Sequence, residues 1–598
     1  MNQLYTIDLV NIKVIDAVAA DKIFPPHFRT VQNKQPIPEG AFKKRDGLAS
    51  ADVVTSSKKW ECQLITPFFL KGSSIADTIA AFSNETDGNL CHLFKYVGTT
   101  WSQITSTSTT PESSIVDDGF YYVTNALSLV GTVLTPVLVL VKSETTNAAW
   151  NSNTEKNCCY FIYRNPANGV FTVKSVGNDA STVEPTIQTL NWQSATCAEY
   201  HLNKLWVGGI REPDNPELIA AADNLLVNRH NRIRWSKTGS IDANYSGVGA
   251  GNEGSWGGSG TGYLDVPVTG EHLVVGMRSF RGKLYVLTTS DLFVVTGTTS
   301  DQFGLTRLLS TPSAIGLTMW ASDDYLFWAD ANGIHQFNGS SSKNITEDAV
   351  PLAYKQKQIE QYNQIGTGVA TGYGKVPTAF INEKLKIYGI HWPDLSSANY
   401  SGSPNLAGKE TWLYNYKAQT FSTYVYNLES NYNDVNYISD YHDTGFIWMG
   451  LSNTAEDNPV AAKYTFEPST DDTADPNGAV TTILETGDLN LASLNGFSYE
   501  DVIKLNRVDF YAVPDSSTAI TYKLDITVDN TAQTQQTVSV AAVSGATQPQ
   551  HYVVPLPTTR AGSFFKFTIT EDTASVKGDL RRVDLFYEIM FKRGAGRK

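Results

Sequence analysis

The chain of 598 residues has few cysteines, and none has the spacing of a metal or redox site. There are five, an odd number without any CxxC pair, and Cys158 and Cys159 are adjacent in a predicted strand. Neighbouring side chains of a strand point to opposite faces, so these two thiols are poorly placed to share a metal ion. We expect buried, reduced thiols, no metal and a protein made in a cytoplasm.

Long hydrophobic runs are also lacking. The longest, residues 126–141, is shorter than the roughly 20 residues that a membrane-spanning helix needs, and Gly131 and Pro136 interrupt it. It predicts two buried strands, so we expect no membrane segment. The first ten residues have no basic region followed by a long apolar stretch, and we expect no signal peptide.

Positive charge is scarce, with 46 Lys and Arg against 60 Asp and Glu, a net charge of −14. The basic residues form no long blocks, which disfavours tight binding that sheathes a nucleic acid. Charged residues make up only 18%, whereas Trp, Tyr and Phe number 12, 29 and 26. This composition favours strands with large buried rings, so the predicted class is all-β.

Two hairpins follow one another in residues 280–297 and 325–339. Each is an apolar strand, a polar turn and a second apolar strand. The turns contain Ser290-Asp291 and Asn332-Gly333, residue types that tolerate the backbone of tight hairpin loops. Together with further strand pairs along the chain, these hairpins predict a β-propeller of six or seven units with insertions.

Changes in composition and strand pattern along the sequence predict four parts. Residues 1–59 are an extended arm, 60–470 a propeller with loop and short-helix insertions, 471–590 an antiparallel β-sandwich that forms a platform with the arm, and 591–598 a basic tail. The short helices are predicted at 74–82, 216–228 and 350–362.

Motifs for catalysis or cofactor binding are weak. Residues 249–254 match GxGxxG but lie in a glycine- and serine-rich loop without a strand-turn-helix context. Gly374-Lys375 lacks the remainder of a phosphate-binding loop, and the nine histidines have no metal-ligand spacing. We therefore expect no enzyme, no cofactor and no catalytic residues.

Two local clusters leave a functional alternative open. The best paired carboxylates for sugar cleavage are Asp323-Asp324 with Asp330, although turn positions favour Asp for backbone hydrogen bonding alone. The basic segment 229–236 has the composition of a phosphate site, but a solvated edge strand is the preferred interpretation.

Several segments, taken in order, resemble the tail nozzle (stabilisation or tail tubular) proteins of short-tailed bacteriophages. The resemblance is best in the middle third of the chain and loose in the N-terminal arm. In the C-terminal sandwich only the general sequence pattern is similar. The segments are 29–33, 40–47, 232–236, 239–245, 277–286, 292–297, Gly316 and 328–339.

The resemblance implies a structural virion protein, assembled in the cytoplasm of a bacterial host. Six copies would form a ring below the portal and the head-tail adaptor, in contact with tail fibre or needle proteins. The ring would retain packaged double-stranded DNA and conduct it during ejection without reading its sequence. Its formal charge would be −84, six times that of one chain, which suits repulsion of a polyanion.

Short basic clusters are candidate interface groups because they complement acidic neighbours. Ordinary surface charge is the alternative. The candidates are Lys43, Lys44, Arg45, Arg581 and Arg582.

Two other functions remain open. One is a receptor- or glycan-binding propeller with aromatic side chains around its rim. The other is a tail depolymerase that cleaves polysaccharide, which requires a carboxylate-lined cleft or a parallel β-helix.

Overall fold

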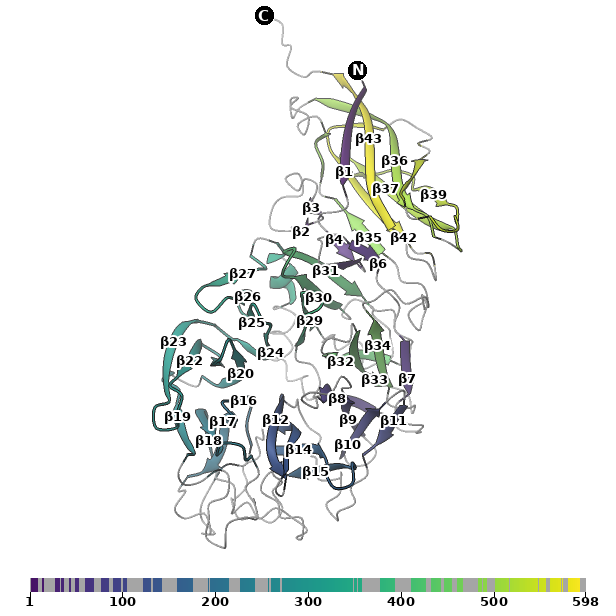
Figure 1. Ribbon diagram of the computed structural model, residues 1–598. Helices are drawn as coiled ribbons and strands as arrows, with labels where there is room; N and C mark the ends of the chain where they lie inside the picture. The colour runs from purple at the N-terminus through teal and green to yellow at the C-terminus, as the bar shows by residue number, and fades with distance from the viewer. Residues whose placement is uncertain are drawn as a thin grey trace, which may run out of the picture.

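The structure is a computed structural model, and it confirms the all-β class. It contains a ring of small sheets and, beyond the ring, a sandwich (Figure 1). It describes residues 2–8, 13–14, 27–28, 30–32, 34–36, 42–44, 49–52, 60–68, 77–84, 90–97, 100–104, 122–130, 133–141, 159–175, 192, 194–214, 226–241, 256, 260–268, 272–347, 349–351, 353–357, 377–392, 410–425, 432–441, 446–453, 460–465, 482–486, 488–491, 501–515, 517–546, 548–554, 556, 560–571, 573 and 579–591.

The ring is a β-propeller of seven four-stranded antiparallel blades. The first four are β8 (Trp60–Phe68), β9 (Asp77–Asn84), β10 (Leu90–Val97), β11 (Thr100–Gln103); β12 (Tyr122–Val130), β13 (Val133–Val141), β14 (Cys159–Arg164), β15 (Phe171–Ser175); β16 (Cys197–His201), β17 (Lys204–Pro213), β18 (Leu226–Trp235), β19 (Gly262–Asp265); and β20 (Val274–Phe280), β21 (Lys283–Thr288), β22 (Asp291–Thr296), β23 (Gly304–Ser310). The other three are β24 (Ile315–Ala321), β25 (Leu326–Asp330), β26 (Gly333–Phe337), β27 (Ser342–Asn344); β28 (Thr378–Asn382), β29 (Ile387–Trp392), β30 (Glu410–Asn415), β31 (Thr420–Val425); and β32 (Tyr432–Tyr441), β33 (Phe446–Asn453), β34 (Val460–Thr465) with β7 (Ala49–Asp52).

The ring closes through a strand from the N-terminal arm. β7 is the outermost strand of the seventh blade and pairs antiparallel with β34, Asp52 opposite Val460. Inside the ring, the first strand of each blade contacts that of the next, from β12 through β16, β20, β24, β28 and β32 to β8. A blade count of seven lies within the predicted six or seven.

Blade strands form because both of their faces are covered. The second and third strands of a blade pack between neighbouring blades, so β14 is buried at its first five positions and β25 along its whole length. Tight turns complete the blades. Leu202 and Asn203 both have positive φ, 51° and 57°, between β16 and β17, which is the two-residue turn geometry that suits twisted hairpins.

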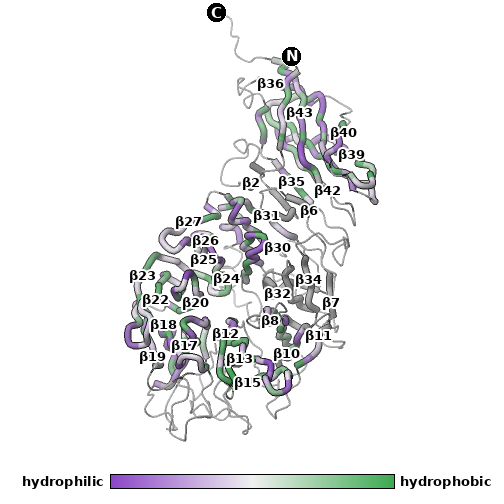
Figure 2. The backbone as a smooth tube through the Cα atoms, viewed as in Figure 1, coloured by the Kyte–Doolittle hydropathy of each residue, from purple (hydrophilic) through white to green (hydrophobic). Residues whose placement is uncertain are grey.

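The sandwich packs two sheets face to face. One is β1 (Asn2–Asp8), β43 (Asp579–Phe591), β36 (Val502–Val513), β40 (Gln550–Val554) and β41 (Arg560–Gly562); the other is β35 (Thr482–Glu485), β42 (Phe565–Glu571), β37 (Ile520–Val528), β38 (Thr531–Ala532) and β39 (Gln536–Val540). Alternate residues of β37 and β42 are buried, as the sequence pattern predicts. The same alternation appears as changing colour along β36 and β43 in Figure 2.

The N-terminal arm joins propeller and sandwich. Its strand β4 (Thr30–Gln32) lies parallel to β31 of the sixth blade and antiparallel to β35, so one ten-stranded sheet runs from the propeller into the sandwich. One hydrophobic cluster spans the same junction, from Trp392 and Trp412 to Leu484 and Phe510. The remaining strands of the arm are β2 (Lys13–Val14), β3 (His27–Phe28), β5 (Lys34–Pro36) and β6 (Phe42–Lys44).

The helix predictions are largely wrong. Residues 77–82 of the helix predicted at 74–82 belong instead to strand β9 and are all buried, and residues 74–76 lie outside the described residues. An apolar run that is covered on both faces does not reveal its period. Residues 351 and 353–357 are helical, which confirms part of the third prediction. Residues 226–228 belong to strand β18, and the rest of the second predicted helix, like the tail at 592–598, lies outside the described residues. Among the residues described, no helix combines the length and apolar character needed to cross a membrane.

We predict that two N-terminal truncations have different effects. Removal of residues 1–8 takes away only β1 and should lower the thermal stability of the sandwich. Removal of residues 1–52 also takes away β4 and β7, so the propeller should lose stability as well, with a fall of roughly 5 °C or more in its unfolding temperature. Differential scanning calorimetry measures both; equal curves for the two truncations would contradict closure by β7.

Candidate functional site

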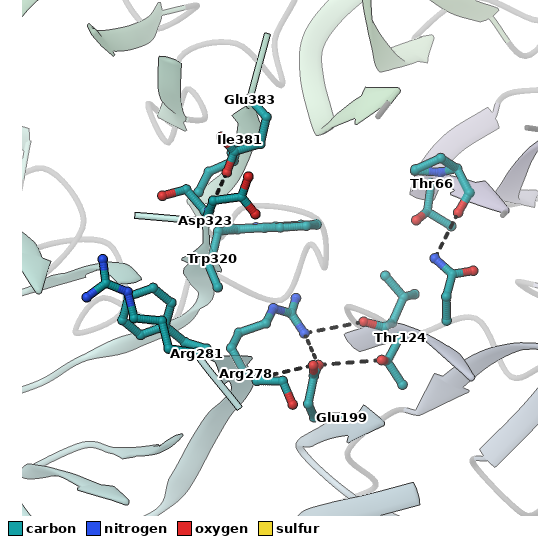
Figure 3. Close-up of a pocket in the computed structure, with 16 residues that line it drawn as sticks. Thr66, Thr124, Glu199, Arg278, Arg281, Trp320, Asp323, Ile381 and Glu383 are labelled. Atoms are coloured by element: carbon teal, nitrogen blue, oxygen red, sulfur yellow. Dashed lines mark hydrogen bonds and ion pairs between the residues drawn. The ribbon is translucent and has the colours of Figure 1, made fainter. Parts of the chain in front are cut away.

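A cavity of about 530 Å³ lies on the axis of the propeller (Figure 3). Its lining comes from the innermost strands of six blades, β8, β12, β16, β20, β24 and β28, and from the turns that follow β20, β24 and β28. Backbone positions far apart in the sequence thus converge on one space, which we call the axial cavity. Its chemistry is set by Glu199, Arg278, Trp320, Asp323 and Glu383.

Arg278 is the centre of the polar network on one side of the axial cavity. Its guanidinium lies between two rings, 4.4 Å from the centroid of Tyr122 and 4.7 Å from that of Trp320. Its Nε donates to the carbonyl of Met319 at 3.1 Å, and its Nη1 lies 3.2 Å from Oε2 of Glu199. The side chain is therefore fixed by contacts from three blades.

Glu199 on β16 faces Arg278. Besides the ion pair, its carboxylate accepts hydrogen bonds from the backbone N–H of Ser279 at 3.1 Å and from the hydroxyl of Thr124 at 3.4 Å. Burial raises the pKa of Glu199 above its ordinary value of 4.5, even though Arg278 and these hydrogen bonds act in the opposite direction. Such a carboxyl retains its proton to a higher pH than a solvated one.

A second carboxylate lies across the axial cavity, in the turn after β28. Glu383 accepts a hydrogen bond from the backbone N–H of Asp323 at 2.6 Å and one from the hydroxyl of Tyr416 at 2.9 Å. Lys386 Nζ lies 3.0 Å from Oε2 of Glu383, the same oxygen that accepts the hydrogen bond from Tyr416. These bonds tie the fifth blade to the sixth at the mouth of the cavity, with the exposed Asp323 beside them (Figure 3).

The arrangement is suited to hold a small polar molecule. Carboxylates and hydroxyls supply acceptors, guanidinium and backbone groups supply donors, and one indole supplies a flat apolar surface. Within the described residues, no three His, Cys, Asp or Glu side chains are grouped so that they could bind a metal ion.

The carboxylates predicted as a group are separated in the structure. Asp323 borders the axial cavity, whereas Asp324 is exposed beside it, 3.9 Å from Lys386 Nζ. Asp330 lies at the other end of β25, buried, where it accepts from the backbone N–H of Asn332 at 2.8 Å and pairs with His335 at 3.0 Å. Asp330 therefore has the turn-stabilising contact that its position in the sequence favours.

The basic segment 229–236 lies on β18, which pairs on both sides, so the edge-strand interpretation is wrong. Its arginines are neutralised within the blade. Glu212 contacts Arg232 at 2.5 Å and Arg234 at 2.7 Å, and Asp265 holds Arg232 at 2.7 Å. These ion pairs oppose binding of a phosphate on this face.

The predicted interface residues lie in two places. Lys43 and Lys44 are on β6, and Arg45 is outside the described residues. Arg581 is exposed at the start of β43. Arg582 forms a pair with Asp584 at 2.7 Å, and that carboxylate also accepts from Thr6 of β1 at 2.8 Å, so Arg582 helps to hold the arm strand.

Sequence reasoning singled out Asp323 but missed Glu199, Arg278, Trp320 and Glu383 as members of a site. Each stands in an ordinary strand or turn, and they meet only when six blades close into a ring. The available signal was a charged residue within a buried first strand, as in the segment 197–201.

No family model and no curated protein matches the chain. Solved structures that are similar to it include an exo-β-1,3-galactanase from Phanerochaete chrysosporium, with 11% identity over 90% of this chain and 100% of the galactanase, TM-score 0.25. A puromycin-hydrolysing peptidase from Mycobacterium tuberculosis is 10% identical over 80% of this chain and 61% of its own, TM-score 0.34. AofleA from Arthrobotrys oligospora is 10% identical over 66% and 95%, TM-score 0.27.

These comparisons contradict the expectation that the chain is not an enzyme, because hydrolases are prominent among the similar structures. At identities of about 10% and TM-scores of 0.25 and 0.34, these structures give this chain neither a substrate nor a reaction.

We predict that Glu199 makes stability depend on pH. A carboxyl whose pKa is raised on folding contributes stability that is fully present below pH 4.5 and is lost as the pH rises through the folded value. Glu199→Gln removes this titration. The unfolding temperature of the variant minus that of the parent chain should therefore rise as the pH increases from 4.5 to 8.

Thermal unfolding followed by circular dichroism across this range measures the effect. Glu588→Gln, an acid-to-amide change on the sandwich beside Lys504, is the matched control. If the unfolding temperature of Glu199→Gln minus that of the parent falls or stays constant with rising pH, or if Glu588→Gln shows the same rise, the prediction is contradicted.

Proposed function

We propose that the chain is a subunit of the tail nozzle of a short-tailed bacteriophage. In this proposal six copies form a ring below the portal and the head-tail adaptor, retain packaged DNA and conduct it during ejection. The resemblance on which this rests lies in residues 277–286, 292–297 and 328–339, which are the hairpin strands of the fourth and fifth blades.

The observation that supports this proposal best is the continuity of the propeller with the sandwich. Domains of one chain ordinarily move relative to each other unless their interface is large and hydrophobic. Here β4 extends one sheet across the junction, and a single hydrophobic cluster runs beneath it. A ring subunit that resists the pressure of packaged DNA needs this stiffness between its platform and its projecting part.

Charge agrees with a conduit. The net charge of −14 favours passage of a polyanion over retention at the wall, and the arginines of β18 are already paired with Glu212 and Asp265. In this proposal the DNA is neither bound tightly nor read by sequence.

The test of location is electron microscopy of phage particles labelled with an antibody against residues 501–591. The label should lie on the tail axis below the head, and averaged tails should show a coaxial ring. A label on the tail fibres or the capsid surface, or its absence from the particles, overturns the proposal.

We predict that Arg581→Glu weakens ring assembly about tenfold or more, because this exposed cation faces an acidic neighbouring copy in the proposed ring. Native mass spectrometry of the chain with its adaptor measures the fraction assembled. Lys343→Glu, an equal charge change at an exposed position of β27, is the control. Equal assembly of both variants contradicts the interface role of Arg581.

A second candidate function is the binding or cleavage of carbohydrate. The axial cavity favours it, because an indole and carboxyl groups from several blades converge there. A glycan array and a reducing-end assay on bacterial surface polysaccharide, both with the full chain, test this candidate. Absence of binding and of cleavage on every glycan excludes it.

A further inference from the structure

We propose that the axial cavity binds one neutral pyranose ring, stacked on the indole of Trp320. The inference rests on the second candidate function, carbohydrate recognition, and adds to it the site, the class of ligand and the residue that selects it.

Trp320 presents one indole face to the axial cavity. Arg278 covers the other face, with its guanidinium carbon 4.7 Å from the ring centroid. In Figure 3 the indole is seen edge-on, with Arg278 on one side and Asp323 and Glu383 toward the other. Trp320 is half-buried at the end of β24 and packs against the large hydrophobic cluster, so its ring is held in place. A fixed, flat apolar surface at a polar cavity suits the C–H face of a sugar ring.

The volume of the axial cavity fits a small ligand. About 530 Å³ lies within the roughly 300–1,000 Å³ of typical small-molecule sites. A single sugar ring with its first aglycone atoms can enter, while the rest of a chain would continue toward solvent.

The charges of the lining exclude an anion as the preferred ligand. Three carboxylates, Glu199, Asp323 and Glu383, stand against the guanidiniums of Arg278 and Arg281. Arg278 is paired with Glu199, and Arg281 donates to the carbonyls of Asn338 and Asp324 at 2.8 and 3.2 Å. Lys386 is paired with Glu383 in the same way, so a phosphate or sialic acid would find these cations already engaged, whereas a neutral polyol needs no free cation.

Hydrogen-bonding groups that line the axial cavity match the hydroxyls of a sugar. The carboxylate of Asp323 and the side chain of Asn125 border the same space, as does Thr124, whose hydroxyl already contacts Glu199. Carboxylate oxygens accept from two neighbouring hydroxyls, and an amide both donates and accepts. This mixture discriminates between pyranoses by the orientation of their hydroxyls, while the indole supplies most of the affinity.

The experiment is saturation-transfer difference NMR on the full chain with methyl glycosides of galactose, glucose and mannose, with glycerol as a polyol that lacks a ring face. At least one glycoside should bind with a Kd in the millimolar range, its ring-face protons receiving the strongest saturation, and glycerol should give no signal. Trp320→Ala should weaken that binding at least tenfold, and Trp320→Phe less. Trp101→Ala, a half-buried tryptophan of β11 in the outer part of the first blade, should leave it unchanged.

Circular dichroism and thermal unfolding first establish that each variant is folded; if Trp320→Ala fails to fold, Trp320→Phe and Asp323→Asn provide the comparison. Equal binding by the Trp320 variants and the parent overturns the inference. If the glycan array is positive in that case, the chain still binds carbohydrate, but at another site. No binding of any glycoside to the parent, on a positive array, also overturns it. A negative array removes both the second candidate function and this inference.

Discussion

The architecture depends on the N-terminal arm, three of whose strands pair in three different large sheets. β1 lies in the sandwich beside β43, β4 joins the two parts of the molecule, and β7 closes the ring. Without this arm the seventh blade would have three strands and the junction would lose the strand that links its two sheets. Backbone hydrogen bonds from one short stretch of chain thus fix how propeller and sandwich are oriented.

The axial cavity is a product of that closure. Its polar side chains come from the first strands of the blades and from the turns that follow them, and contacts from other blades hold several of them, as Glu199 and Met319 hold Arg278. Buried charges of this kind are tolerated only when such partners are present. The same contacts that arrange the side chains of the cavity also tie the blades together, so these residues stabilise the ring.

The sequence allowed the class, the hairpins and the alternation of the sandwich strands to be predicted, because these follow from local patterns such as Asn332-Gly333 or the segment 565–570. It misled where an element is covered on both faces, as in β9, since a fully apolar run has no visible period. The axial cavity could not be predicted. Glu199 and Glu383 are 184 positions apart in the numbering, and only the closed ring brings their strands to a common axis.

The closing strand also sets the order in which the molecule can be completed. β7 leaves the ribosome early, but its partner β34 follows about four hundred residues later, a delay of roughly 20–80 s at ordinary rates of bacterial synthesis. Throughout that interval β7 lacks its partner strand β34, so its edges are able to pair with another chain. Folding therefore succeeds only if the last blade is translated before nascent chains mispair. The growth temperature and the supply of chaperones should therefore decide the yield of folded protein.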